Sequence, residues 1–235
     1  MEKIISLSER LNALAVMTGS CDTFTDIGTD HGLLPLYLIQ KGACKRAVAS
    51  DINKGPLKKA MENAKAFGIG EDKISFVLSD GLKALDDPPE GHNVLSISGM
   101  GGLLIEEILR EGKEKIKCYD SFILSPHTKQ YELRRFLTEN GFIISDERYL
   151  TEENKLYVII KAARGQINDG SSYSEEDYRF GRFIDKALRD EKVKECLAAR
   201  YRELKSLTDD NVNLPPDRRT VLQNEKDSYR KVLGI

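Results

Sequence analysis

The chain has 235 residues, of which 40% are hydrophobic and 31% charged, a composition typical of one full α/β core with a smaller appendage. Its 36 Lys and Arg residues nearly balance 38 Asp and Glu residues, which excludes a strong overall basic field but not a local basic patch for nucleic acid. No apolar run approaches the roughly 18 residues of a membrane helix, and the start lacks the apolar stretch of a secretory signal, so we expect a cytoplasmic protein without membrane contact.

Short apolar runs alternate with helical patterns through the first two thirds of the chain, which is typical of repeated βα units on a parallel sheet. Leu7, Leu11, Leu14 and Ala15 predict a leading helix. Strands are then predicted over 24–28, 47–51, 74–78, 94–98, 122–125, 142–149 and 156–162, and helices over 33–41, 56–67, 103–110 and 131–140. The pattern therefore predicts a mostly parallel, seven-stranded, Rossmann-like sheet.

The last two predicted strands are separated only by residues 151–155. So short a connection requires a hairpin, which makes the last strand antiparallel and places the pair at the sheet edge. Many methyl-transfer enzymes have this arrangement, although a fold alone does not give a function.

The remaining residues predict a helical appendage. Residues 164–172 are polar and contain glycine, as in a linker. Beyond them, helical spacing continues until a break at 213–216 and resumes after it, so we expect two antiparallel helices, a short coiled coil. The apolar positions are Phe180, Phe183, Ile184, Ala187, Val193, Leu197, Leu204, Leu207, Val221, Leu222, Tyr229, Val232 and Leu233. We accordingly divide the chain into a domain of residues 1–163 and a linker with helical hairpin, residues 164–235.

The four cysteines carry little chemical information. Cys21, Cys44, Cys118 and Cys196 are widely spaced, form no Cys-x-x-Cys pair and have only three histidines as possible co-ligands. We expect reduced, structural thiols and no metal site.

Residues 24–32, Phe-Thr-Asp-Ile-Gly-Thr-Asp-His-Gly, form the first candidate ligand loop. Gly28 allows a sharp turn after the strand, and the following helix presents its N–H groups there. A dinucleotide fits poorly, because Asp30 stands where the phosphate-binding pattern has glycine and would repel phosphates. Acidic lining suits the cationic S-adenosylmethionine better. An ordinary strand-to-helix turn is the alternative.

Two further acids follow the next two strands. Asp51 could accept both hydroxyl protons of a ribose, or simply cap the helix that follows. Asp80, before Gly81, could accept from an adenine amine. Because the carboxyl ends of parallel strands meet at one edge, Asp26, Asp51 and Asp80 predict one crevice for an adenosyl cofactor.

Residues 98–102, Ser-Gly-Met-Gly-Gly, follow the fourth strand, where three glycines leave room for a flat group such as a reacting base. A flexible turn is the alternative. Ser125, Pro126 and His127 could form another wall of the pocket, although a structural or exposed role is more common for His127 and for His31. The basic candidates for contacting phosphate, each usually a solvated charge, are Arg10, Lys54, Lys129, Arg134 and Arg135.

Together these motifs resemble the bacterial tRNA (adenine-22, N1) methyltransferases, the TrmK family. The resemblance extends over about residues 6–162. The motifs that carry it are residues 7–11, 26–32, 53–56, 79–82 and 99–102. The helical tail is also similar to that family's carboxyl-terminal coiled coil. It implies a class I S-adenosylmethionine-dependent enzyme that modifies tRNA. The family often has an aromatic residue where Leu33 stands and Gln-Pro-Asn in place of residues 125–127.

We therefore expect direct in-line transfer of the methyl group to N1 of adenine 22, after the base is turned out of its stack. The expected cofactor-binding residues are Asp26, Gly28, Thr29, Gly32, Asp51, Ile52, Asp80, Gly81, Ser98 and Gly99. The expected catalytic residues are Asp30, His31, Ser98 and Met100, and the expected substrate-binding residues are Arg10, Lys54, Gly101, Gly102, Pro126 and His127.

Two other functions stay open at this point. One is a methyltransferase acting on a small molecule or a protein, and the other is a non-catalytic module that binds S-adenosylmethionine or RNA. The tail could be a packed hairpin or a tRNA-holding surface, and we expect a monomer or weak dimer.

Overall fold

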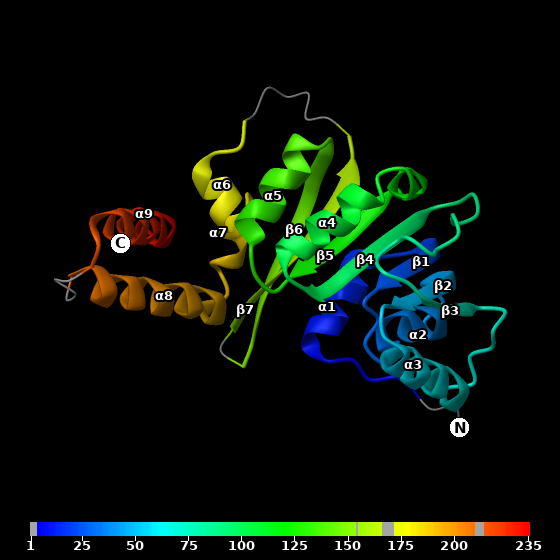
Figure 1. Ribbon diagram of the computed structural model, residues 1–235. Coiled ribbons are helices and arrows are strands. Elements are labelled where there is room, and N and C mark those ends of the chain that lie inside the picture. The colour runs from blue at the N-terminus through cyan, green and yellow to red at the C-terminus, as the bar shows by residue number, and fades with distance from the viewer. Residues whose placement is uncertain (1–3, 154, 166–171, 210–213) are drawn as a thin grey trace.

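A seven-stranded sheet forms the centre of the computed structural model, which describes residues 4–153, 155–165, 172–209 and 214–235 (Figure 1). The strands are β1 (Cys21–Ile27), β2 (Cys44–Asp51), β3 (Ile74–Leu78), β4 (Asn93–Met100), β5 (Ser121–Pro126), β6 (Phe142–Glu152) and β7 (Lys155–Arg164). Their order is β3-β2-β1-β4-β5-β7-β6, and β7 pairs antiparallel with both β5 and β6. The predicted Rossmann-like sheet with an antiparallel last strand is confirmed.

Helices cover both faces of this sheet, so the first part of the chain has three layers. They are α1 (Glu9–Thr18), α2 (Leu33–Gln40), α3 (Lys54–Ala66), α4 (Gly102–Glu111), the short 3-10 helix η1 (Lys115–Cys118) and α5 (Gln130–Glu139). Helices α1, α2 and α3 enclose one apolar core with the fully buried Phe24, and α4 and α5 enclose another with Ile27. Because side chains alternate along β1, these two residues point to opposite faces. With both faces of the sheet covered in this way, the carboxyl ends of the strands are where an open α/β sheet binds its ligand.

The connection between β3 and β4, residues 79–92, is described throughout and contains no helix. It turns tightly at its start, where the Ser79 hydroxyl donates to the carbonyl oxygen of Gly81 at 2.9 Å and accepts from the N–H of Ala84 at 3.0 Å. Asp80 is therefore presented from a loop.

The carboxyl-terminal region is helical, as predicted, but its first segment is not one helix. It comprises α6 (Glu175–Phe180), α7 (Ile184–Ala187), α8 (Glu191–Asp209) and α9 (Pro216–Leu233). Gly181 separates α6 from α7 with a positive φ of 83°, a conformation that helices do not use. Most of the predicted linker, at 166–171, and the first residue of the predicted break, 213, lie outside the described residues.

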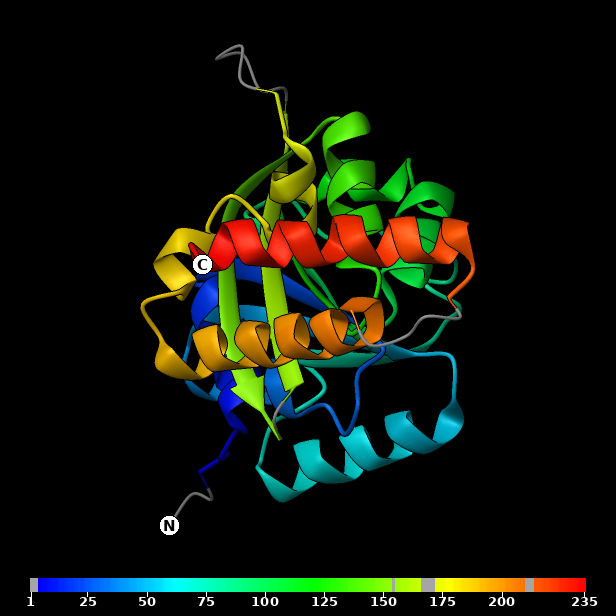
Figure 2. The same cartoon turned by 90° about the vertical axis from the view of Figure 1, so that its left-hand side faces the viewer.

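Helices α8 and α9 lie side by side and antiparallel, as Figure 2 shows. Arg200 on α8 contacts Glu225 on α9 at 3.0 Å, and Lys226 contacts Asp209 at 2.8 Å. The apolar core of this appendage also includes Tyr149 of β6, so the helices pack against the edge of the sheet.

A buried ion pair joins the sheet edge to the appendage. Arg134 of α5 donates from Nε to Glu147 of β6 at 2.6 Å, and both side chains are only 1% exposed. The Nη1 group of Arg134 donates to the carbonyl oxygens of Tyr178 and Arg179 at the end of α6. The hypothesis that Arg134 contacts phosphate is therefore wrong, because its guanidinium is enclosed by the protein.

Three simpler predictions concern cysteines, metals and membranes. All four cysteines are free, as expected. Across the described part of the chain, His, Cys, Asp and Glu side chains form no group of three suited to a metal, and no helix is both long and apolar enough to span a bilayer.

Candidate active site

A crevice of about 570 Å³ lies at the carboxyl ends of the parallel strands, where open α/β sheets bind ligands. It brings together most of the predicted site residues from the ends of β1 to β5. Those that line it are Arg10, Asp26, Gly28, Asp30, His31, Asp51, Ile52, Asp80, Gly81, Ser98, Gly99, Met100 and His127. Its volume is in the usual range for a small-molecule site.

Six predicted residues do not line the crevice: Thr29, Gly32, Lys54, Gly101, Gly102 and Pro126. Thr29 is fully buried, and its N–H donates to the carbonyl oxygen of Ser50 at 2.9 Å. Gly32 starts α2 with φ 67°, and a Cβ there would lie 2.8 Å from the Cβ of Ala60 on α3. These two residues shape the loop from behind.

Gly28 is required by backbone conformation and by space. Its φ is 76°, and an added Cβ would lie 2.4 Å from Cε of Met100. Side chains rarely adopt such a φ, because Cβ then crowds the backbone. A side chain at residue 28 would therefore strain the backbone and displace the methyl end of Met100.

Asp26 is the most deeply enclosed acid of the crevice, with 5% exposure. Burial raises its pKa to about 6, and the nearby Asp51 adds to this rise, while the hydroxyls of Thr29 and Ser96 oppose it. Among the described residues, its Oδ1 accepts no hydrogen bond. Since a buried, unpartnered carboxylate oxygen is costly, this atom favours a donor or cation supplied by a ligand.

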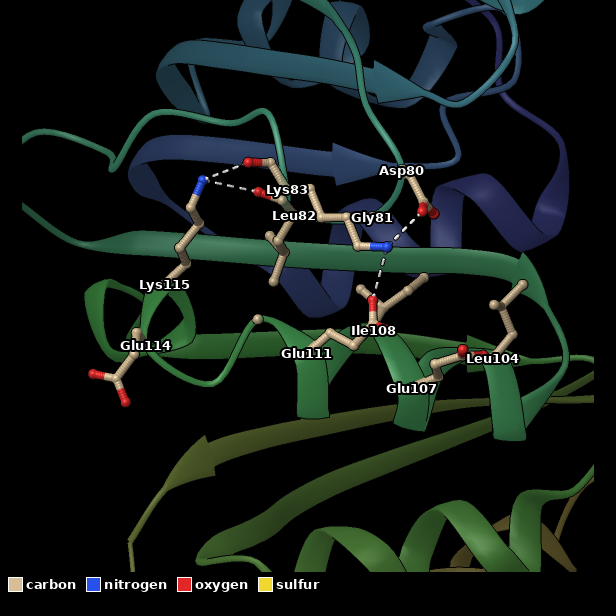
Figure 3. Close-up of a pocket in the computed structure, with 11 residues that line it drawn as sticks. Asp80, Gly81, Leu82, Lys83, Leu104, Glu107, Ile108, Glu111, Glu114 and Lys115 are labelled. Atoms are coloured by element: carbon tan, nitrogen blue, oxygen red, sulfur yellow. Dashed lines mark hydrogen bonds and ion pairs between the residues drawn. The ribbon is translucent and has the colours of Figure 1, made fainter.

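Asp51 and Asp80 lie at the ends of neighbouring strands. Oδ1 of Asp51 accepts from the N–H of Asn53 at 2.7 Å, which holds the carboxylate at the start of α3. Asp80 is more exposed, and Oδ2 lies 2.6 Å from Nζ of Lys83, which also contacts Glu111 at 3.0 Å (Figure 3). Each carboxylate keeps a second oxygen that can accept from a ligand.

Asp30 and His31 stand at the open side of the crevice. The Asp30 side chain is 82% exposed, and its Oδ1 lies 3.0 Å from Nε2 of His31. His31 has a positive φ of 60°, and its carbonyl oxygen accepts from Nδ2 of Asn63 at 2.8 Å. Tertiary contact thus fixes a loop conformation that a non-glycine residue seldom adopts.

The three glycines at the end of β4 and the start of α4 differ in what surrounds them. An added Cβ at Gly99 would meet open space, whereas one at Gly102 would lie 2.4 Å from the carbonyl oxygen of Lys129. Gly101 faces the hydroxyl of Thr128 at 3.2 Å. The room expected for a flat group is therefore found at Gly99, because the loop after β5 fills the space at Gly102.

A basic and aromatic cluster forms one rim of the crevice. Nη1 of Arg10 lies 3.0 Å from Nε2 of His127, and the guanidinium stands 5.2 Å from the ring centre of Tyr157. Because arginine only donates, Nε2 of His127 accepts and the proton of the neutral ring is on Nδ1. Burial lowers the pKa of His127, and the charges of Arg10 and Lys155 lower it further.

Several residues of the crevice and its rim were not predicted as site residues from the sequence. Tyr157 belongs to β7 and reaches the rim only because that strand inserts beside β5. Apolar lining residues such as Leu104 and Ile108 look like ordinary positions of an amphipathic helix. Their helical spacing predicts that they face inward, but it does not predict which part of the protein or which ligand they contact.

The likeness to known proteins agrees with this geometry. Residues 7–160 match the model of a family described as a methyltransferase domain. The chain is 31% identical over 173 residues to the tRNA (adenine(22)-N(1))-methyltransferase of Bacillus subtilis, covering 72% of this chain and 71% of that protein.

Solved structures extend the likeness to the appendage. Streptococcus pneumoniae Sp1610, in complex with S-adenosyl-L-methionine, superposes with a TM-score of 0.85 at 31% identity, covering 97% of this chain and 100% of that one. Mycoplasma capricolum TrmK, in complex with S-adenosyl-homocysteine, gives a TM-score of 0.82 at 27% identity over 97% of this chain and 98% of that one.

Proposed function

This chain belongs to the bacterial tRNA (adenine(22)-N1)-methyltransferase family, and on that premise we propose how its crevice performs the reaction. The enzyme transfers a methyl group from S-adenosylmethionine to N1 of adenine 22 in tRNA and yields 1-methyladenosine. The observation that carries the assignment of roles is the convergence of three strand-end acids and the open space at Gly99 in one crevice.

The crevice residues fit S-adenosylmethionine chemically. The ligand is cationic at sulfur and nitrogen, and the unpartnered Oδ1 of the buried Asp26 offers a matching acceptor. We assign the amino-acid part of the cofactor to Asp26 and Gly28, the ribose to Asp51 and the adenine amine to Asp80. The remaining cofactor contacts proposed are Thr29, Gly32, Ile52, Gly81, Ser98 and Gly99, with Thr29 and Gly32 acting through loop shape.

Bound S-adenosylmethionine supplies an activated methyl carbon, which the N1 lone pair attacks in line with the departing sulfur. The enzyme's own contribution is to hold the turned-out base, whose unstacking costs a few kcal/mol, and to stabilise the charge that appears on it. The exposed Asp30 carboxylate and the Ser98 carbonyl are placed to stabilise the cationic product base. Met100 forms a wall beside Gly28, and His31 orients Asp30.

We assign the tRNA-binding rim to Arg10, His127 and Lys54, with Pro126, Gly101 and Gly102 as its backbone support. The Arg10 guanidinium and the Nδ1–H of His127 are both donors, and Arg10 carries a positive charge, so they suit a phosphate next to the target nucleotide. Residues 1–163 would form the methyltransferase domain, and residues 164–235 the linker and hairpin. We also propose that the enzyme acts in the cytoplasm as a monomer or weak dimer.

The decisive experiment is methyl incorporation from labelled S-adenosylmethionine into bulk bacterial tRNA, with the product nucleoside located by digestion and mass spectrometry. We expect 1-methyladenosine at position 22. Asp30→Ala should lose most turnover while keeping cofactor affinity and the fold. Cofactor binding without incorporation into any RNA would contradict the assignment, and wild-type turnover in Asp30→Ala would remove that carboxylate from the reaction.

A further inference from the structure

The loop that presents Asp80 is tied down by a distant lysine. Nζ of Lys115, in η1, lies 3.0 Å from the carbonyl oxygens of both Leu82 and Lys83 (Figure 3). It also donates to the carbonyl oxygen of Leu85. An ammonium group has three N–H donors, so this one loop uses them all. The connection has no helix whose N–H groups could bond these carbonyl oxygens, and the ammonium group of Lys115 donates to them instead.

Side-chain packing also holds this loop against the end of α4. Leu82 and Leu85 are buried in the core beside α4, and a Cβ at Gly112 would lie 2.3 Å from Cδ1 of Leu82. Gly112 therefore lets the loop approach the end of α4 closely. Lys115 follows Gly112 by one turn, which brings its ammonium group under the loop carbonyls.

This attachment sets the shape of the cofactor crevice at its β3 end. A pocket of about 250 Å³ lies between the loop and α4, and four residues line both it and the larger crevice: Asp80, Gly81, Leu104 and Ile108. A flat ring entering there meets the apolar side chains of α4 on one side and the Asp80 loop on the other. The position of the loop thus decides where the Asp80 carboxylate meets that ring.

We propose that Lys115 is a positioning residue for recognition of the adenine ring, because its ammonium group fixes the loop that carries Asp80. The proposal rests on the role given to Asp80 in the proposed function. In the sheet order, β3 stands two strands, about 10 Å, from β1, whose loop carries Asp30. Loss of Lys115 therefore weakens cofactor recognition and leaves the methyl-transfer step itself unaffected.

Lys115→Met in the full-length enzyme tests this, with Lys117→Met as a matched control. Lys117 lies in the same 3-10 helix, but its exposed ammonium group pairs with Glu114. Affinities for S-adenosylhomocysteine and S-inosylhomocysteine are measured by calorimetry. The inosine ring has an oxygen where adenine has its amine, so it cannot donate to Asp80 from that position.

We expect wild type and Lys117→Met to prefer the adenosyl compound. In Lys115→Met the affinity for it should fall about tenfold, that for the inosyl compound should change little, and the ratio should approach one. The KM for S-adenosylmethionine should rise with kcat nearly unchanged. Lys115→Arg, which keeps a cation and its donors, should recover part of the preference.

The measurements distinguish the role of Asp80 in binding the adenine ring from the role of Lys115 in positioning Asp80. If wild type itself does not discriminate between the two compounds, the role of Asp80 is wrong. If wild type discriminates and folded Lys115→Met keeps the same ratio, the role of Lys115 is wrong while that of Asp80 stands. Should Lys115→Met fail to fold, Lys115→Gln replaces it, and an unchanged ratio in that variant overturns the proposal equally.

Discussion

The crevice and the junction between sheet and appendage both bury a carboxylate, but Glu147 at the junction is paired with a cation and Asp26 in the crevice is not, although Nη2 of Arg134 at the junction also lacks a partner within the described residues. At the junction, Glu147 accepts from Arg134, and the single O–H of Tyr149 lies within hydrogen-bond distance of both Glu147 and the carbonyl oxygen of Phe180. In the crevice and just behind it, Oδ1 of Asp26 and the hydroxyls of Ser50 and Ser125 have no partner within the described residues, while the hydroxyls of Thr29 and Ser96 interact with the Asp26 carboxyl group.

The difference separates a paired carboxylate, which we expect to hold the structure, from an unpaired one, which we expect to meet a ligand. A buried polar network with its partners in place specifies how two parts of a protein pack. A buried acceptor without a partner costs stability until a ligand supplies a donor. Substitutions at the junction should therefore change folding, and substitutions in the crevice should change binding.

The largest effect is expected from Arg134→Met, which would leave Glu147 buried without its cation. Removing one partner of such a pair costs about 3 to 5 kcal/mol of folding stability. Urea denaturation measures the loss, and Arg135→Met, which breaks an exposed pair with Glu139, should change the free energy of unfolding far less. Equal losses in the two variants would show that the buried network is not what holds the junction.

Asp26→Asn should have the opposite effect on stability. The pKa of Asp26 is about 6 when folded and about 3.9 in an unfolded chain. Between these values the folded state binds more protons, so the ionised group costs stability as pH rises, up to about 3 kcal/mol above pH 6. The variant should therefore be more stable than wild type at pH 7. It should also bind S-adenosylhomocysteine at least about tenfold more weakly, because it loses a hydrogen bond to a charged group.

In the wild-type enzyme, ionisation of Asp26 should also make the affinity for S-adenosylhomocysteine depend on pH. Protonation of Asp26 below about pH 6 removes the carboxylate from the ligand, so calorimetric affinity for S-adenosylhomocysteine should fall there. Asp51, the acid beside it, is retained in Asp26→Asn, which makes that variant the control. A fall of equal size in the variant would assign the pH dependence to another group.

Gly28→Ala should have an intermediate effect, and Gly19→Ala is its control. Both glycines have a positive φ near 70°, so an alanine at either position strains the backbone and lowers stability. Only at Gly28 does the new Cβ meet Met100, while Gly19 has nothing within 4 Å. We expect lower cofactor affinity in Gly28→Ala alone, by calorimetry, and equal affinity in both variants would contradict the crevice geometry.

Arg10→Met should have the smallest effect, on tRNA and not on the cofactor. Loss of one phosphate contact makes the logarithmic salt dependence of tRNA binding shallower by about one unit. Lys45→Met removes an exposed charge that pairs with Asp22 near the opposite ends of the strands and should leave that slope unchanged. An unchanged slope in Arg10→Met would place Arg10 outside the RNA interface.

What could be predicted from the sequence follows from which interactions are local. Asp26, Asp51 and Asp80 each stand at the end of an apolar run, so strand pattern and topology alone bring them together. The prediction of one continuous helix through Gly181 was wrong. The interaction that disfavours a side chain at this position comes from Glu147, 34 positions earlier in the chain, and so leaves no local signal in the sequence. Tyr157 and Lys115 were missed for the same reason, since their partners belong to other elements.

The position of β7 has a consequence for synthesis. This strand is inserted between β5 and β6, although both precede it in the chain. While the polypeptide emerges from the ribosome, β5 therefore keeps an open edge until Arg164 has been made, and an open apolar edge is a template for aggregation. A nascent chain halted after β6 would have every crevice loop and still be unable to close its sheet.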